Sequence, residues 1–227
     1  MTRIVAGSAK GRTLAVPKSG TRPTSERVRE ALFSRLDHMN VLEEATVLDL
    51  YAGTGALGLE ALSRGASSAT LVEKASGAAR VATANVRSTG LSARVVTADS
   101  RAYLGGRSAE PLSGEVDLVF IDPPYDIAEE EMTAVLEGLA PWIGPDALVV
   151  VERSTRAPVP TWPAFLVLED TRAWGETVAY FAGPPLPEED AEEPAQAPEE
   201  ATASSLEEGP QLSPSSPGLL TPSRTDT

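Results

Sequence analysis

The segment Asp49-Leu50-Tyr51-Ala52-Gly53-Thr54-Gly55-Ala56-Leu57-Gly58 decides the fold, because it joins an apolar strand over 46–51 to a helix over 56–64. Its glycines allow a tight turn, and the first turn of the helix offers unpaired N–H groups. In open α/β sheets, ligands bind at the edge where the carboxyl ends of the strands lie. The segment therefore predicts a ligand site inside a βαβ unit.

On both sides of this segment, apolar strands alternate with amphipathic helices. We predict further strands over 69–73, 94–98, 116–121 and 147–152, and helices over 77–88 and 129–139. The last two strands, near 165–169 and 177–181, are separated only by a turn at Trp174-Gly175, which indicates an antiparallel hairpin. The pattern predicts an α/β fold, a doubly wound and mostly parallel sheet of seven strands with helices on both faces.

Charge and composition divide the chain into three parts. Residues 1–40 form a basic extension, in which segments 3–7 and 12–16 predict a small hairpin and 24–36 a helix. Residues 41–182 form the sheet domain. Residues 183–227 are acidic and hold 9 of the 19 prolines, which predicts a disordered tail. The net charge of −14 therefore conceals a basic N-terminus, the one part of the chain suited to a polyanion.

Several classes of protein are excluded by composition. The chain has no Cys and a single His, His38, so thiolate metal sites, a Cys nucleophile and multi-His sites are ruled out, and we expect no metal. No apolar run is long enough to span a bilayer, and the first residues do not resemble a signal peptide. We expect a cytoplasmic, monomeric protein with no membrane partner.

Two ligands compete for the glycine-rich turn. Gly53, Gly55 and Gly58 spell G-x-G-x-x-G, and Glu73 follows Gly53 by 20 residues. This spacing suits a dinucleotide or S-adenosylmethionine, because the ribose of either ligand needs a carboxylate. Asp49 favours S-adenosylmethionine, because a carboxylate attracts its ammonium group and would repel a pyrophosphate. A merely structural glycine turn is the third alternative.

Asp99 ends the strand over 94–98 and has two interpretations. Its carboxylate can accept from an adenine amino group, or it can cap the segment that follows. With this residue the predicted cofactor site comprises Asp49, Tyr51, Gly53, Gly55, Glu73 and Asp99.

A second motif, Asp122-Pro123-Pro124-Tyr125, follows the apolar strand over 116–121. The prolines alone would fit a plain strand-ending turn. The acid and the aromatic beside them indicate amine methylation: Asp122 and the Pro123 carbonyl accept the N–H bonds of an exocyclic amine, and Tyr125 stacks on a flipped base. A nicotinamide enzyme has no use for this tetrapeptide, so the two motifs together indicate an S-adenosylmethionine-dependent N-methyltransferase.

The chain resembles the RsmD-type family, bacterial 16S rRNA guanine-N2 methyltransferases, over about residues 3–181. The matching segments are Arg3–Gly7 with Gly11-Arg12, Arg22–Thr24 with Arg27–Phe33, Asp49–Leu62, Asp122–Tyr125 and Trp174–Thr177. The resemblance implies a Rossmann-like class I methyltransferase fold, S-adenosylmethionine as cofactor and 16S rRNA or the 30S subunit as partner. It implies Asp122, Pro123 and Tyr125 as the residues that address guanine. The acidic tail departs from the family's compact pattern.

The basic extension then acquires a role in RNA binding. Arg12, Arg22, Arg27 and Arg29 are its candidate phosphate ligands, although ion pairs on a solvated helix face would also explain the helical arginines. Two alternatives to the rRNA enzyme stay open. The same chemistry could act on DNA adenine or a protein glutamine, or a degenerate site could leave a module that only binds nucleotide or RNA.

Overall fold

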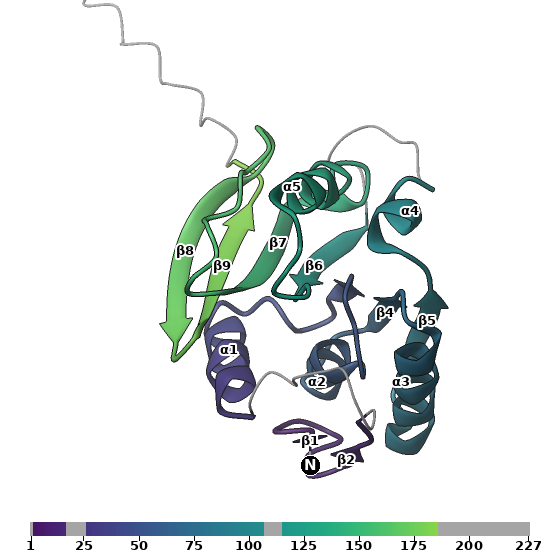
Figure 1. Ribbon diagram of the computed structural model, residues 1–227. Coiled ribbons are helices and arrows are strands. Elements are labelled where there is room, and N and C mark those ends of the chain that lie inside the picture. Colours follow the sequence, from purple (N-terminus) through teal and green to yellow (C-terminus); the bar gives the residue numbers. More distant parts are fainter. Residues whose placement is uncertain (1, 17–25, 107–114, 186–227) are drawn as a thin grey trace, which may run out of the picture. The chain divides into compact units, whose positions relative to one another are not determined.

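The computed structural model describes residues 2–16, 26–106 and 115–185. Within them a seven-stranded sheet has helices on both of its faces (Figure 1). The elements are, in chain order, β1 (Thr2–Arg3), β2 (Thr13–Leu14), α1 (Glu26–His38), β3 (Thr46–Asp49), α2 (Ala56–Ser63), β4 (Ser68–Glu73), α3 (Ser76–Thr89), β5 (Ala93–Thr97), α4 (Ser100–Leu104), β6 (Val116–Ile121), α5 (Glu129–Glu137), β7 (Ile143–Ser154), β8 (Val167–Trp174) and β9 (Thr177–Gly183).

The strand order is β5-β4-β3-β6-β7-β9-β8. Strands β5, β4, β3, β6 and β7 pair in parallel, and β9 pairs antiparallel with both β7 and β8. The predicted doubly wound sheet with a closing hairpin is therefore confirmed. The order reverses between β3 and β6, and such a switch point opens a crevice beyond the carboxyl ends of these strands.

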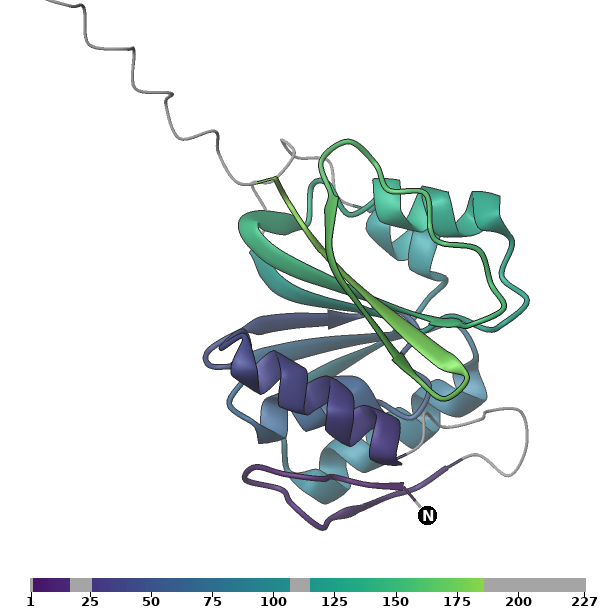
Figure 2. The same cartoon turned by 90° about the vertical axis from the view of Figure 1, so that its left-hand side faces the viewer.

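Side chains alternate between the faces of the sheet and fill two cores. Val47 and Phe120 belong to the core beneath α1, α2 and α3. Leu48 and Val119, their neighbours in sequence, belong to the core beneath α4 and α5. Figures 1 and 2 show these two helical layers on opposite sides of the sheet. Because both faces are buried, the central strands are almost continuously apolar, as in the sequence pattern.

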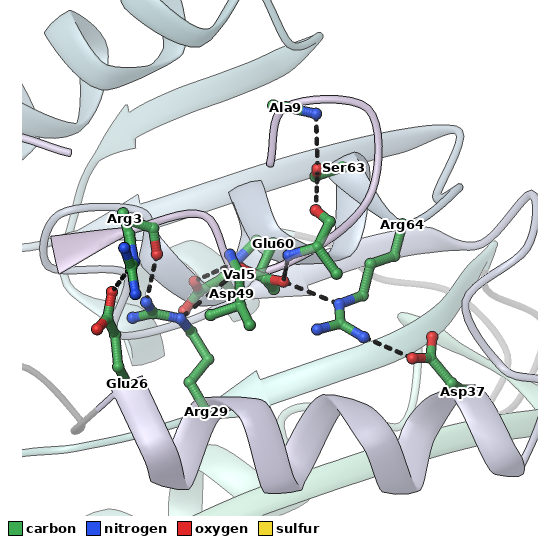
Figure 3. A network of polar contacts seen from close by, with 12 residues as sticks. Arg3, Val5, Ala9, Glu26, Arg29, Asp37, Asp49, Glu60, Ser63 and Arg64 are labelled. Atoms are coloured by element: carbon green, nitrogen blue, oxygen red, sulfur yellow. Dashed lines mark hydrogen bonds and ion pairs between the residues drawn. The ribbon is translucent and has the colours of Figure 1, made fainter. Parts of the chain in front are cut away.

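The N-terminal hairpin of β1 and β2 is hydrogen-bonded directly to helices α2 and α3. Glu60 on α2 accepts hydrogen bonds from the amides of Val5 and Ala6, at 2.7 and 3.0 Å (Figure 3). Asn85 on α3 accepts from the Ala15 amide at 2.8 Å and donates to the Ala15 carbonyl at 3.0 Å. The hairpin is thus held by side chains of α2 and α3.

Strand boundaries differ from expectation in the C-terminal part. β8 runs from Val167 to Trp174, beyond the predicted end at 169, because the apolar run stops at Leu168 and the rest of this edge strand carries mostly polar, exposed side chains. β7 starts at Ile143, upstream of the predicted start, through a Gly-Pro pair that resembles a turn. Most of the predicted tail lies outside the described residues. None of the helices in the described ranges is long and apolar enough to cross a membrane.

Candidate active site

A cleft of about 1480 Å³ opens at the carboxyl ends of the central strands. It brings together residues that the two sequence motifs predicted, although the motifs lie far apart along the chain. The predicted residues that line it are Asp49, Tyr51, Gly53, Glu73, Asp99, Asp122, Pro123, Tyr125, Arg27 and Arg29. Gly55 and Arg12 are not part of its lining, and Arg22 lies outside the described residues.

Gly55 shapes the glycine-rich turn. It has a φ of +81°, and a Cβ atom there would lie 2.9 Å from Leu71 Cδ1. Gly53 has a φ of +55° and lies in the wall of the cleft. Both angles fall where side chains are disfavoured, so the chain needs glycine to turn from β3 into α2 at this point.

Asp49 ends β3 and is 1% exposed. The Gly58 amide donates to its Oδ2 at 3.2 Å, whereas its Oδ1 has no hydrogen-bond partner among the described residues. Burial raises the pKa of Asp49 to about 7, and the carboxylates of Asp122 and Glu73 add to this shift. Hydrogen bonds from backbone amides oppose the shift only in part, so the site contains a buried acid with one oxygen, Oδ1, left without a partner among the described residues.

Glu73 fastens the turn to the end of β4. Its Oε2 accepts from the Gly53 amide at 2.8 Å, and its Oε1 accepts from the Ala75 amide at 2.6 Å. A carboxylate oxygen has more than one lone pair, so the same group can still accept from a ligand hydroxyl. Its predicted contact with a ribose remains a prediction.

Asp99 caps α4, as one of the two interpretations proposed. Its Oδ1 accepts from the amides of Arg101 and Ala102 at 3.1 and 3.2 Å, and Lys74 lies 3.0 Å from its Oδ2. The bond from Lys74 lowers the pKa of Asp99, so its carboxyl is ionised at neutral pH. Because Asp99 also lines the cleft, the predicted contact with adenine stays open.

Tyr51 and Tyr125 lie in different settings within the same cleft. Burial raises the pKa of Tyr51 to about 12, so its hydroxyl stays protonated. Tyr125 is 61% exposed, an unusual position for a large aromatic side chain. It follows the buried Pro123 and the exposed Pro124, which stiffen the loop that carries it.

Asp122 lies beyond the end of β6 and is partly exposed at the cleft. Its charge raises the pKa of Asp49, so the two acids are within electrostatic reach. The second motif therefore faces the same space as the first.

The predicted arginines separate into two groups. Arg27 is exposed in the first turn of α1 at the cleft, and Arg12 donates to the Ser88 carbonyl at 2.8 Å on another surface. Arg29 corrects our expectation, because its side chain is 1% exposed. It donates to the Arg3 carbonyl at 2.5 Å and lies 3.8 Å from Glu60 (Figure 3). A guanidinium fixed in this way is structural and cannot reach a phosphate.

Three residues that line the cleft or hold its glycine-rich turn in place were missed by the sequence analysis. Glu152 and Arg153 lie near the C-terminal end of β7, are 3% and 5% exposed, and line the cleft. Asn85 donates at 2.9 Å to the Thr54 carbonyl in the glycine-rich turn. For the first pair the available signal was that the predicted apolar strand over 147–152 ends on one charged residue, Glu152, and is followed directly by another, Arg153. Nothing local marks Asn85, since its partners are 31 and 70 positions away. Within the described ranges, no group of three or more His, Asp or Glu side chains could hold a metal ion.

Comparison with known proteins decides the family. The sequence profile of the family described as Conserved hypothetical protein 95 matches residues 2–183. The ribosomal RNA small subunit methyltransferase D of Escherichia coli K12 is 38% identical over 180 residues, covering 78% of this chain and 87% of that protein. The protein of the same name from Haemophilus influenzae is 35% identical over 174 residues, which cover 74% of this chain and 86% of that protein.

The chain belongs to the Conserved hypothetical protein 95 family. The solved structure described as "Putative methyltransferase yhhF from Escherichia coli" superposes with a TM-score of 0.68 at 34% sequence identity, and the match covers 81% of this chain and 97% of that one. The structure of a hypothetical protein of Thermus thermophilus superposes with a TM-score of 0.68 at 33% sequence identity, and the match covers 80% of this chain and 98% of that one. The fold is that of the class I methyltransferases, as predicted.

Proposed function

We propose that this protein transfers a methyl group from S-adenosylmethionine to the exocyclic N2 amine of one guanine in 16S rRNA. The observation that carries the proposal is the meeting, in one cleft, of the turn after β3 with the Asp122-Pro123-Pro124-Tyr125 loop after β6. Family members named as small-subunit rRNA methyltransferases support it. Transfer to DNA adenine or protein glutamine has no comparable support. An rRNA substrate would place the activity in the cytoplasm.

The cofactor half of the cleft fits S-adenosylmethionine. The buried, unpaired Oδ1 of Asp49 suits the ammonium group of the methionine moiety, because a cation would satisfy it. The same carboxylate would repel a pyrophosphate, which argues against a dinucleotide. Glu73 and Asp99 line the cleft further along, where they would accept from the ribose and the adenine amine.

The second half of the cleft would hold the amine. S-adenosylmethionine supplies an electrophilic methyl group, whose bond to sulfur breaks as N2 bonds to it, sulfur keeping the electron pair. An exocyclic amine is a weak nucleophile because its lone pair is delocalised. Asp122 and the Pro123 carbonyl would accept its two N–H bonds, hold it in line and favour a pyramidal nitrogen. After transfer N2 gives up one proton, and Asp122, partly exposed, can pass it to solvent.

Tyr125 and the N-terminal arginines would bind the RNA. A base flipped from its stack can lie on the exposed ring of Tyr125, a contact worth roughly 1–3 kcal/mol. Arg27 at the cleft and Arg12 on the hairpin can neutralise phosphates despite the acidic chain, because polyanions respond to local charge.

Tritium transfer from S-adenosylmethionine tests the proposal. Small-subunit rRNA and 30S particles isolated from a strain that lacks this enzyme should accept label from the wild type. Asp122→Ala should abolish transfer while S-adenosylmethionine still binds, and Asp146→Ala, an exposed acid outside the cleft, should be unaffected. If the wild type labels neither substrate but labels DNA or protein, the proposal is wrong.

A further inference from the structure

Glu152 lies beside Asp122, on the neighbouring strand β7. β6 and β7 pair in parallel with Ile121 opposite Val151, so the next residues, Asp122 and Glu152, continue the two strands at the same level. Neighbouring strands are about 4.8 Å apart. The carboxylate of Asp122, just past the end of β6, and that of Glu152, inside β7, therefore lie side by side, and both residues line the cleft.

The two side chains also share a face of the sheet. Phe120 and Val150 belong to the core beneath α1, and side chains two positions further on point the same way. Arg153, the next residue, belongs to the opposite face, where Glu129 of α5 pairs with it at 2.5 Å. The charge of Arg153 is therefore neutralised away from Glu152.

Glu152 is one of the carboxylates that act on the buried Arg29. Burial lowers the pKa of Arg29, and among the carboxylates that oppose this shift Glu60 and Glu26 contribute more than Glu152 does. Glu152 is 3% exposed and lines the same cleft as Asp122. Its place in the wall of the cleft, level with the proposed amine acceptor, suggests use by a ligand.

Guanine has a hydrogen-bond donor that a second carboxylate, that of Glu152, could accept. Along its Watson–Crick edge guanine presents N1–H directly next to the N2 amine, so both are donors. Adenine and 2-aminopurine have a lone pair at N1, which a carboxylate repels. If Asp122 and the Pro123 carbonyl take the N2 hydrogens, the next donor on that edge is N1–H.

We propose that Glu152 accepts a hydrogen bond from N1–H of the target guanine and thereby selects guanine over bases with an unprotonated N1. This inference rests on the proposed function. It makes Glu152 a specificity-determining residue of the amine half of the cleft, distinct from the S-adenosylmethionine half around Asp49 and Glu73.

Base analogues at the methylated position test the proposal. Once wild-type transfer has been mapped to one nucleotide, 30S particles are reconstituted with 16S rRNA that carries guanine or 2-aminopurine there. Both bases have the N2 amine, and 2-aminopurine lacks N1–H. Glu152→Gln can donate its amide to the N1 lone pair, so the ratio of kcat/KM for guanine to that for 2-aminopurine should fall by roughly tenfold to a hundredfold.

Two controls separate specificity from folding. Glu130→Gln, the same change on an exposed residue of α5 outside the cleft, should keep the wild-type ratio. The affinity of Glu152→Gln for S-adenosylmethionine, measured by calorimetry, should equal that of the wild type, because its carboxylate belongs to the other half. Glu152→Ala should lower the guanine rate without any gain on 2-aminopurine.

Each outcome has one meaning. A guanine to 2-aminopurine ratio that stays at its wild-type value in Glu152→Gln overturns the role of Glu152, even if both rates fall together, which is what a purely structural residue would give. If the wild type fails to methylate the guanine particle, the proposed function itself has failed. A ratio that falls while cofactor affinity is unchanged supports the proposal.

Discussion

Asp49 and Glu60 are both buried acids next to the glycine-rich turn, and they differ in how they are satisfied (Figure 3). Glu60 is 0% exposed and accepts from the Val5 and Ala6 amides, and Arg64 donates to it at 2.8 Å. Asp49 is 1% exposed and accepts from the Gly58 amide at 3.2 Å, but its Oδ1 has no hydrogen-bond partner among the described residues. One acid is complete within the protein, and the other is not.

The difference separates a structural acid from a binding acid. Folding tolerates a buried carboxylate when its partners repay the lost hydration, and Glu60 has such partners. An acid left short of partners destabilises the free protein and is kept when a ligand completes it. We therefore expect Glu60 to govern folding and Asp49 to govern cofactor binding.

Glu60→Ala should have the largest effect on stability. It leaves the guanidinium of Arg29 buried without its nearest carboxylate, 3.8 Å away, and frees two amides of the hairpin. Removing one partner of a buried pair costs about 3–5 kcal/mol. Urea unfolding followed by circular dichroism measures the loss, and Glu137→Ala on the surface of α5 is the control. A change of the size seen in the control would mean that Glu60 is not structural.

Asp49→Asn should show the opposite pattern to Glu60→Ala: it should weaken cofactor binding and leave stability intact. A hydrogen bond to a charged group contributes about 1.5–3 kcal/mol, so the affinity for S-adenosylmethionine should fall by roughly tenfold to a hundredfold. The free energy of unfolding should be maintained or increased, because a buried charge has been removed. Calorimetric titration reports the first and urea unfolding the second. If Asp49→Asn bound S-adenosylmethionine as tightly as the wild type, Asp49 would not be a binding acid and would not differ from Glu60 in this respect.

The affinity for S-adenosylmethionine should depend on pH through Asp49. Its pKa of about 7 is above the ordinary value, so the folded protein takes up a proton there as pH falls from neutral, and the uncharged acid no longer attracts ammonium. Affinity should decrease by up to about tenfold per unit below pH 7. Because the folded protein holds this proton more tightly than the unfolded chain does, the ligand-free protein loses stability as pH rises from about 4 to 7. Asp49→Asn should flatten the binding profile, and a flat wild-type profile would refute the assignment.

Arginines 27 and 29 repeat the contrast on a smaller scale. Arg27 is exposed at the cleft, so Arg27→Ala should weaken rRNA binding and lower the slope of log affinity against log salt by about 0.9. Arg29 is buried on Arg3 and Glu60, so Arg29→Ala should lower stability and leave the slope unchanged. Filter binding over a series of salt concentrations distinguishes the two, and equal slopes in both variants would contradict it.

The fold could be predicted because its signals are local. The apolar run Val116–Ile121 and the glycines after β3 mark their elements without reference to the rest of the chain. The cleft followed from topology, since parallel strands place their carboxyl ends at one edge. The edge strand β8 was predicted too short, because the apolar run that marks its start ends at Leu168 and the solvent-exposed remainder is polar.

The state of individual side chains could not be predicted. Arg27 and Arg29 are two positions apart on α1, and which of them is buried depends on Glu60 and on the Arg3 carbonyl, far away in sequence. The level at which Glu152 meets Asp122 likewise depends on strand register. Sequence patterns identify types of residue at an edge, whereas partners across the fold decide which of them remain available to a ligand.

The most direct measurement is nucleoside mass spectrometry of small-subunit particles incubated with the enzyme and S-adenosylmethionine that carries a deuterated methyl group. We predict N2-methylguanosine with three deuterium atoms at a single position of 16S rRNA, and none with Asp122→Ala. Labelled methyladenosine, label on a guanine atom other than N2, or undiminished labelling by Asp122→Ala would contradict the account.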